Sequence, residues 1–278
     1  MHPYINALGR DIPVFGLMAL AGIGAALGIV ALLCPRKGVN RSDATLTALM
    51  AVACAMAGAW LIGPIIKLPD VLIHWERYSS MPLGSFLAWF AGGIVYYGGF
   101  IGGAAGALIF CRAFKMPFLP MADIYAVALP AGHALGRVGC FFGGCCFGVE
   151  VPATHPLAVT YPPRHDGLDA VAAPAGVPLL PVPLIEAAGN LIISAAVLCF
   201  LYLTRRSAVP GRALALYGLL YSAQRFTIEF FRGDALRGVY GGVSTSQYIS
   251  VALFALSAAL MLWTFRKKKP PLCPAPCP

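Results

Sequence analysis

Residues 12–33 read IPVFGLMALAGIGAALGIVALL, a run without a charged side chain. A helix needs about 20 consecutive apolar residues to cross the hydrocarbon core of a bilayer. The run is also longer than the apolar segment of a secretory signal peptide, which has roughly 7–15 residues. It therefore predicts a transmembrane helix near the start of the chain.

The rest of the chain repeats this pattern. Of its 278 residues, 59% are hydrophobic and 11% are charged, whereas soluble domains carry about 25% charged residues. Further apolar runs of spanning length occupy 45–66, 84–110, 121–142, 184–204, 213–231 and 245–265. The predicted fold class is an all-α, polytopic transmembrane helical bundle of about seven spans.

We expect residues 1–269 to form a single transmembrane domain, followed by a disordered tail rich in proline and cysteine at 270–278. The runs 84–110 and 121–142 contain many glycines, so either one could be broken or re-entrant. The segment at about 143–183 is too long for a simple connection, and we expect a functional loop or an unstructured one.

The basic residues carry a topology signal. Twelve of the 20 lysines and arginines lie in the connections after the first, third and fifth runs and in the tail. Because cytoplasmic connections are enriched in these residues, the N-terminus is predicted outside, the C-terminus in the cytoplasm, and the loop 143–183 outside. The net charge of +9 is explained by this distribution and does not predict a nucleic-acid partner.

Two arginines lie inside apolar runs. Arg137 belongs to HALGRVGCFFGGCCFG at 133–148, and Arg225 to YSAQRFTIEFFR at 221–232. An arginine at the bilayer centre costs about 2.5–3.5 kcal/mol on insertion scales, so it marks a functional site by default. A guanidinium binds phosphate through two hydrogen bonds. The two arginines therefore predict a pocket for an anionic ligand, such as a lipid phosphate.

The surroundings of Arg137 favour this interpretation. Gly136, Gly139 and Gly148 belong to a glycine-rich segment whose backbone N–H groups could point at an anion. His133 precedes Arg137 by one helical turn and shares its face. We treat the three glycines as candidate substrate-binding residues and His133 as a candidate catalytic residue.

A second polar stripe surrounds Arg225. Tyr221, Arg225 and Glu229 are spaced four residues apart and share one helix face. The stripe either lines the pocket, or Arg225 and Glu229 neutralise each other within the bundle. Glu186 and Asp123 are isolated acids near the starts of their runs, where a helix dipole favours negative charge.

A third feature is GGFIGGAAG at 98–106, preceded by Tyr97. Glycines four residues apart allow helices to approach closely. Gly98, Gly99 and Gly102 therefore indicate helix packing, or alternatively a thin wall beside a lipid headgroup with Tyr97 as its polar group. We keep these residues as candidate substrate-binding positions and Tyr97 as a candidate catalytic one.

Cysteines form the last feature. The nine cysteines are too scattered for a disulfide scaffold. Cys140, Cys145 and Cys146 lack the cysteine spacing typical of zinc sites, so no metal is predicted even with His133 nearby. Small packing residues are the favoured interpretation, and a redox pair remains an alternative.

Four blocks together resemble the prolipoprotein diacylglyceryl transferase family. They are GGFIG at 98–102, GRVGCF at 136–141 with Gly148, YSAQRFTIEFFR at 221–232, and STSQ at 244–247. The resemblance implies a multi-pass enzyme of the bacterial plasma (inner) membrane, without a cofactor. Such an enzyme transfers a diacylglyceryl group from phosphatidylglycerol, or a similar anionic phospholipid, to the lipobox cysteine of a prolipoprotein.

The resemblance also implies roles for single residues. Arg137 and Arg225 match the family's phosphate-side arginines, and Tyr221, Glu229 and Gly148 match other site residues. The chain departs from the family pattern where it has Phe15 for tyrosine, Tyr97 for histidine, Cys140 for asparagine and Cys145 for glutamate.

These departures leave the general base open between His133 and Tyr97, and they leave alternative functions open. One alternative is a divergent lipid transferase in which Cys140 or Cys145 is a local nucleophile or acceptor. The others are a non-catalytic phospholipid-binding membrane protein and a thiol-disulfide oxidoreductase.

Overall fold

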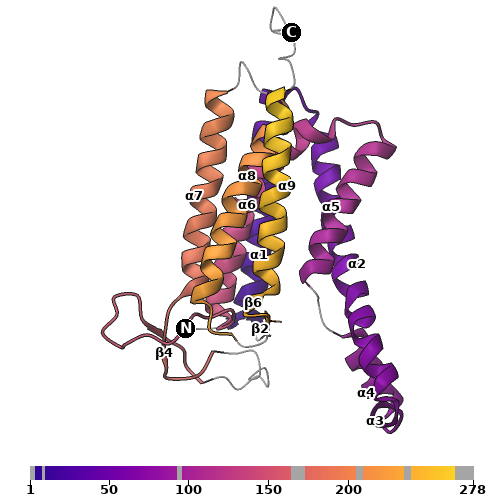
Figure 1. Cartoon of the computed structure of the whole chain (residues 1–278), viewed down its shortest axis with the longest axis vertical. Coiled ribbons are helices and arrows are strands. Elements are labelled where there is room, and N and C mark those ends of the chain that lie inside the picture. Colours follow the sequence, from indigo (N-terminus) through magenta and orange to yellow (C-terminus); the bar gives the residue numbers. More distant parts are fainter. Residues whose placement is uncertain are drawn as a thin grey trace, which may run out of the picture. The chain divides into compact units, whose positions relative to one another are not determined.

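The computed structural model describes residues 4–7, 10–92, 96–163, 173–204, 209–234 and 239–266. The chain is mainly helical (Figure 1). The helices are α1 (Val14–Leu33), α2 (Arg41–Ile73), α3 (Trp75–Ser79), α4 (Leu83–Ala91), α5 (Tyr96–Ala113), α6 (Phe118–Phe142), α7 (Val182–Leu203), α8 (Arg212–Ile228) and α9 (Thr245–Arg266), with 3-10 turns η1 (Pro35–Lys37) and η3 (Glu229–Phe231). The all-α fold class is confirmed.

Strands are short and pair as three antiparallel two-stranded ribbons. They are β1 (Tyr4–Ala7) with β2 (Arg10–Pro13), β3 (Val159–Thr160) with β4 (Pro178–Leu179), and β5 (Val239–Tyr240) with β6 (Val243–Ser244).

Five of the described helices are long and apolar enough to cross a membrane, namely α1, α2, α6, α7 and α9. The chain is therefore a multi-pass membrane protein. The predicted seven spans are not confirmed, because α8 and α5 are shorter than the other five. The predicted orientation, N-terminus outside and C-terminus inside, stays a prediction.

The run 84–110, expected as one span, is two helices. Helix α4 ends at Ala91, and Gly92 has an extended backbone with φ −75° and ψ 152°. Helix α5 begins at Tyr96. Glycine is a poor residue for a helix interior because it loses the most backbone freedom on folding, so a helix ends readily there. The glycine content had already indicated a possible break in this run.

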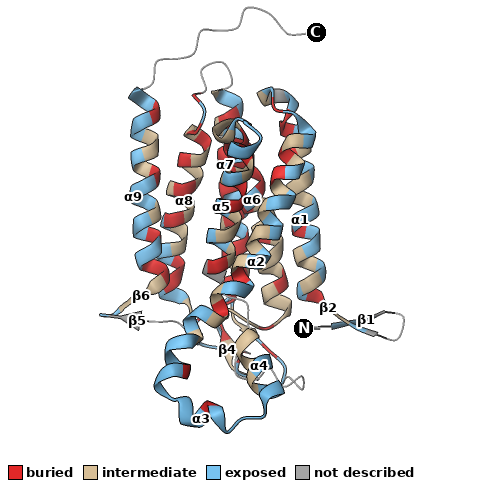
Figure 2. Cartoon of the chain, turned by 90° about the vertical axis from the view of Figure 1, so that its right-hand side faces the viewer, coloured by how far each residue is buried: buried red, intermediate tan, exposed pale blue. Residues whose placement is uncertain are grey.

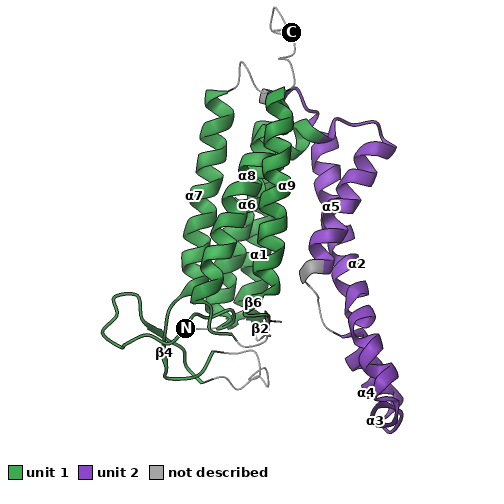
Figure 3. Cartoon of the chain, viewed as in Figure 1, with its two compact units in different colours: residues 1–33, 119–278 green, residues 34–118 purple. Residues whose placement is uncertain are grey.

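The chain divides into two compact units, coloured separately in Figure 3. Unit 1 comprises Met1–Leu33 and Leu119–Pro278, and unit 2 comprises Cys34–Phe118. The single domain at 1–269 stays a prediction, and the tail 270–278 lies outside the described residues.

Unit 1 is a bundle of α1, α6, α7, α8 and α9, in which buried residues gather along α6 while α1 and α9 keep long exposed faces (Figure 2). Helices α1 and α6 meet at two glycines. A Cβ on Gly22 would lie 2.6 Å from the Gly132 carbonyl oxygen, and a Cβ on Gly132 would lie 2.8 Å from that of Gly22. Small residues of this kind let helices pack by van der Waals contact in lipid.

Asp123 joins α6 to the start of α8. Its buried carboxylate accepts hydrogen bonds from the backbone N–H groups of Gly211 and Leu214, both at 2.9 Å. The first N–H groups of a helix have no partner inside the helix, so an acceptor here caps it. The sequence suggested a charge that stabilises Asp123's own helix; the carboxylate instead caps a helix about 90 residues later in the chain.

Helix α9 begins with a reciprocal cap. The Ser244 N–H donates to Gln247 Oε1 at 3.0 Å, and the Gln247 N–H donates to Ser244 Oγ at 3.2 Å. This is the capping-box arrangement. The block at 244–247 that contributed to the family resemblance therefore has a structural role at the start of α9.

In unit 2, glycines bring α5 against α2. A Cβ on Gly98 would collide with the Gly58 carbonyl oxygen, and one on Gly102 with that of Cys54. A Cβ on Gly99 would lie 3.4 Å from the Ala55 carbonyl oxygen. These contacts are the ones that helix packing predicts. A substrate-binding role for the three glycines stays a prediction.

The segment after α6 is ordered over its described parts, 143–163 and 173–181. The Gly148 N–H donates to the Leu180 carbonyl oxygen at 3.0 Å, and the Val149 N–H donates to that of Phe231 at 2.9 Å. A Cβ on Gly148 would lie 2.5 Å from the Leu180 oxygen, so only glycine fits. The loop is thereby tied to the ends of α7 and α8.

We predict that Asp123→Ala lowers the free energy of unfolding by about 1–3 kcal/mol, because two buried N–H groups of α8 lose a charged acceptor. Thermal unfolding in detergent, followed by circular dichroism, measures the effect. Asp123→Asn keeps one accepting oxygen and should fall between Asp123→Ala and the unmodified protein. An unchanged melting temperature for Asp123→Ala would show that the cap contributes nothing.

Candidate active site

One carboxylate lies between the two intramembrane arginines. Glu186, in the second turn of α7, is 3% exposed. Its Oε1 lies 3.2 Å from Nη1 of Arg225, and its Oε2 lies 2.9 Å from Nε of Arg137. Helices α6, α7 and α8 therefore meet at one buried charge.

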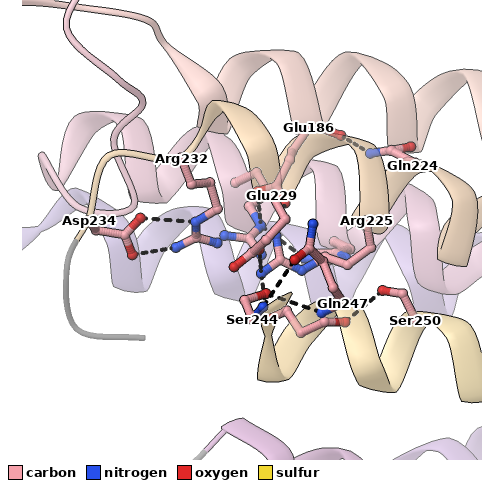
Figure 4. A network of polar contacts seen from close by, with 12 residues as sticks. Glu186, Gln224, Arg225, Glu229, Arg232, Asp234, Ser244, Gln247 and Ser250 are labelled. Carbon is pink, nitrogen blue, oxygen red and sulfur yellow. Dashed lines mark hydrogen bonds and ion pairs between the residues drawn. The ribbon is translucent and has the colours of Figure 1, made fainter. Parts of the chain in front are cut away.

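Arg225 has further partners, which Figure 4 shows around its guanidinium. Its Nη2 lies 2.7 Å from Oε2 of Glu229, one turn later on the same chain segment. The same nitrogen donates to Oγ of Ser246 in α9 at 2.9 Å. The proposed neutralisation of Arg225 by Glu229 is thus present, and Glu186 adds a second acid. Two arginines and two glutamates give this cluster balanced formal charge, as buried ions require.

His133 completes the surroundings of Arg137. The Arg137 Nε–H donates to Nε2 of His133 at 3.1 Å. A ring nitrogen that accepts a hydrogen bond carries no proton, so this arrangement corresponds to neutral histidine protonated on Nδ1. The His133 ring also contacts Tyr221 of α8, with ring centroids 5.9 Å apart. The structure therefore brings both candidate residues beside Arg137.

Arg137 keeps donor capacity. Its partners within the described part of the chain, Glu186 and His133, both contact Nε. No hydrogen bond or ion pair from its two terminal NH₂ groups is found among the described residues. A phosphate could bind there through parallel hydrogen bonds.

Arg232 marks the end of the site nearest the loop. It forms a bidentate pair with Asp234, at 3.0 and 2.7 Å, and its backbone pairs with Gly148. The Arg232 side chain is only 7% exposed.

Three thiols gather where α6 ends. The Sγ atoms of Cys140, Cys145 and Cys146 lie within 4.8 Å of one another. A left-handed turn brings them together, because Gly144 has φ 62° and Cys146 has φ 58°. The prediction of no metal used the number of residues between cysteines along the chain. That number does not show that this turn brings the three thiols together in space.

The charge distribution around the thiols is uneven. Hydrogen bonds with Cys140 and Cys145, assisted by the positive charges of Arg137 and Arg232, lower the pKa of the Cys146 thiol. Burial raises the pKa of Tyr161 to about 12, and the nearby thiols add to the shift. Hydrogen bonds and nearby positive charge thus favour a thiolate within the cluster, whereas burial disfavours ionisation of the Tyr161 phenol.

The predicted residues fall into two groups. Unit 1 holds most of them, namely Arg137, Arg225, Tyr221, Glu229, His133, Gly136, Gly139, Cys140, Cys145 and Gly148. Among these, Gly139 packs against Phe15 and Met18 of α1, whereas a Cβ on Gly136 would meet nothing within 4 Å. Gly98, Gly99, Gly102 and Tyr97 belong to unit 2, and the Tyr97 side chain lies outside what the structure describes.

Two residues of α7 were missed as site residues. The sequence predicts Glu186 only as an isolated acid, and it assigns no role to Asn190. Asn190 is 1% exposed, and its Oδ1 has no hydrogen-bond partner within the described ranges. Glu186, Asn190 and Ser194 are spaced four residues apart in an otherwise apolar run, and this periodicity was the signal available in the sequence.

Comparison with known proteins shows which family the chain belongs to. A family model described as prolipoprotein diacylglyceryl transferase matches residues 3–263. The chain belongs to this family.

Curated relatives cover nearly the whole chain. It is 31% identical to phosphatidylglycerol–prolipoprotein diacylglyceryl transferase 2 of Clostridium perfringens, over 94% of this chain and 93% of that protein. The enzyme of the same name from Gloeobacter violaceus is 31% identical over 91% of this chain and 88% of its own length. The Clostridium tetani enzyme is 27% identical over 96% and 100%.

We predict that Glu186→Gln destabilises the protein by about 3–5 kcal/mol, because two buried guanidiniums lose a shared counter-charge. The melting temperature in detergent measures this loss. Glu150→Gln removes a charge from an exposed loop position and serves as the control. Equal melting temperatures for the two variants would contradict a central role for Glu186.

Proposed function

We propose that this chain transfers a diacylglyceryl group from phosphatidylglycerol to the lipobox cysteine of a prolipoprotein, in the bacterial inner membrane. The observation that carries the proposal is the pair Arg137 and Arg225, joined by the buried carboxylate of Glu186. The names of the family's curated members support the donor and the acceptor.

The reaction needs a site for developing negative charge. A sulfur–carbon bond forms between the cysteine thiol and the glycerol carbon, and the carbon–oxygen bond to phosphate breaks. The electron pair of that bond leaves with glycerol 1-phosphate. Preorganised donors aimed at the leaving oxygen lower the barrier most when water is excluded.

The two arginines have different parts in this proposal. The terminal NH₂ groups of Arg137 bind the phosphate, since its contacts with Glu186 and His133 use only Nε. Both terminal nitrogens of Arg225 already contact Glu186, Glu229 or Ser246. Arg225 therefore holds Glu186 in place, and Glu186 in turn orients Arg137.

His133 and Tyr221 are the proposed proton-handling groups on this side. Their rings are in contact, and His133 Nε2 is held by Arg137. His133 Nε2 can accept a proton when the Arg137 Nε–H turns fully to Oε2 of Glu186, which lies 2.9 Å from the same nitrogen. Tyr97 remains the alternative base that the family comparison suggests.

The topology proposal follows from the basic residues. With the N-terminus outside, the loop 143–163 and the thiols at the end of α6 face the outer side. A prolipoprotein substrate then presents its lipobox cysteine at that face.

We predict that Arg137→Lys lowers transfer by about 100–1,000-fold, because a point charge replaces a bidentate donor at the leaving phosphate. Arg225→Lys should have a smaller effect on transfer and a larger one on melting temperature. The assay is complementation of a bacterium depleted of its own transferase, together with lipoprotein processing by gel shift. Arg112→Lys, at an exposed position of α5, is the matched control.

Full transfer by Arg137→Ala would overturn the assignment. If the unmodified chain is present in the membrane, fails to rescue, and yet co-purifies with phosphatidylglycerol, it is a phospholipid-binding protein without transfer activity.

A further inference from the structure

The cluster of Cys140, Cys145 and Cys146 is not used by the mechanism above. Its sulfur atoms lie within 4.8 Å of one another. A tetrahedral zinc ion with Zn–S bonds of 2.3 Å places its sulfur ligands about 3.8 Å apart. The three thiols therefore need to contract by only about 1 Å to share one zinc ion. A disulfide instead requires sulfur atoms about 2.05 Å apart.

The backbone is arranged to hold the thiols together. Cys146 adopts φ 58°, a left-handed conformation that non-glycine residues rarely adopt. The turn is closed by the Gly143 N–H donating to the Gly139 carbonyl oxygen at 2.9 Å, and by the Cys145 N–H donating to that of Cys140 at 3.2 Å. Such unfavourable conformations persist where the surrounding structure requires them, and they concentrate at functional sites.

The donor set selects a particular kind of ion. Among the described residues the donor group consists of three sulfur atoms and no carboxylate, and such a set favours thiophilic ions such as zinc. Three thiolates and one Zn²⁺ carry a net charge of −1. Arg137 and Arg232 both interact electrostatically with Cys146, and Arg137 also with Cys140, so the surroundings compensate that charge.

A buried phenol adjoins the cluster. Tyr161 is 4% exposed and interacts electrostatically with all three cysteines. Its hydroxyl has no hydrogen-bond partner within the part of the chain described. An O–H group buried without an acceptor is costly, and a zinc-bound thiolate sulfur would provide an acceptor.

We propose that Cys140, Cys145 and Cys146 bind a zinc ion whose fourth coordination position binds the thiol of the incoming lipobox cysteine. The proposal rests on the proposed transferase function and reverses the sequence-based prediction of no metal. Zinc sites with three protein ligands keep the fourth position for water or substrate, as catalytic zinc sites do.

The ion would supply the thiol activation for which the chain lacks the family histidine. The lipobox thiol displaces a water molecule from zinc and loses its proton to solvent, because metal coordination deprotonates thiols. A sulfur lone pair then forms the bond to the glycerol carbon. The carbon–oxygen bond breaks, and glycerol 1-phosphate leaves with the electron pair. The product is a thioether without negative charge, so water replaces it on zinc.

The same chemistry argues against the cluster as a lipid acceptor in turnover. If one of the three thiols attacked the lipid directly, the product would be a thioether on this chain. A second transfer would have to break the carbon–sulfur bond of that thioether, and the thiolate released is a poor leaving group. A metal-bound substrate thiol avoids that end product.

The first test measures the metal content of the purified full chain by inductively coupled plasma mass spectrometry. We expect about one zinc per chain, as a preformed thiolate site binds tightly. The double variant Cys145→Ser/Cys146→Ser should lose at least 90% of the bound zinc, whereas Cys199→Ser, at an exposed position on α7, should lose none. Melting temperatures of all variants show whether they remain folded.

Cobalt(II) exchanged for zinc tests the open position. Cobalt(II) bound to thiolates absorbs visible light. A peptide with a lipobox cysteine should change this absorption spectrum, whereas the same peptide with serine in place of the cysteine should leave it unchanged. Intact-mass measurement detects any disulfide among the three thiols. Any one of three results would overturn the proposal: less than about one zinc per chain, a disulfide among the three thiols, or a cobalt spectrum that the cysteine peptide does not change.

The test separates this proposal from the proposed function. Transfer by a folded, metal-free protein would refute the role of zinc and leave the transferase standing. Zinc binding that responds to the cysteine peptide, in a chain that transfers no lipid, would refute the transferase while the metal site stands. Loss of transfer in the double cysteine variant, with Arg137 intact and the melting temperature retained, is the result that we expect.

Discussion

The structure depends on one carboxylate held between two guanidiniums. Glu186 connects α6 through Arg137 and α8 through Arg225, and Arg225 in turn contacts Ser246 at the start of α9. In a low-dielectric bundle each unpaired charge would be far more costly than in water, so these ions constrain the helices to a common geometry. Removing any one member leaves another charge without compensation. The same ion pairs therefore form the candidate site and hold the helices of the bundle together.

Other contacts in unit 1 supply hydrogen-bond acceptors to the unpaired backbone N–H groups at the starts of helices. Asp123 supplies acceptors to the first turn of α8, and Ser244 with Gln247 supplies them to α9. Glycines serve the complementary purpose, since Gly22 and Gly132 let α1 and α6 approach until backbone atoms touch. In lipid, where apolar surface gains little by helix contact, such close packing and satisfied polar groups provide the association energy. These contacts hold α6 against α1 and α8, and Glu186 joins α7 to both α6 and α8.

At the end of α6, the chain departs from the family pattern at Cys140 and Cys145. The chain keeps the arginines that suit a phosphate, and it has Cys140 and Cys145 where the family has asparagine and glutamate. The left-handed turn at Cys146 adds a third thiol to these two. Under the proposed zinc site, these departures from the family pattern amount to one change of chemistry, from oxygen and nitrogen donors to sulfur. Arg137 interacts electrostatically with Cys140 and Cys146, so the sulfur cluster and the proposed phosphate-binding guanidinium are neighbours.

The sequence by itself determined the membrane class and the helical fold, and it singled out the two arginines as candidate site residues. Apolar length and the cost of a charge in lipid are local properties, and they can be read one segment at a time. The stripe of Tyr221, Arg225 and Glu229 was readable for the same reason, because one helix defines its face. Only the tertiary structure decided that Glu186 serves both arginines, that Asp123 caps a helix far along the chain, and that three cysteines converge. Those relations join segments that are distant in sequence or separated by a left-handed turn, and neither hydrophobic periodicity nor residue spacing encodes the distance between them.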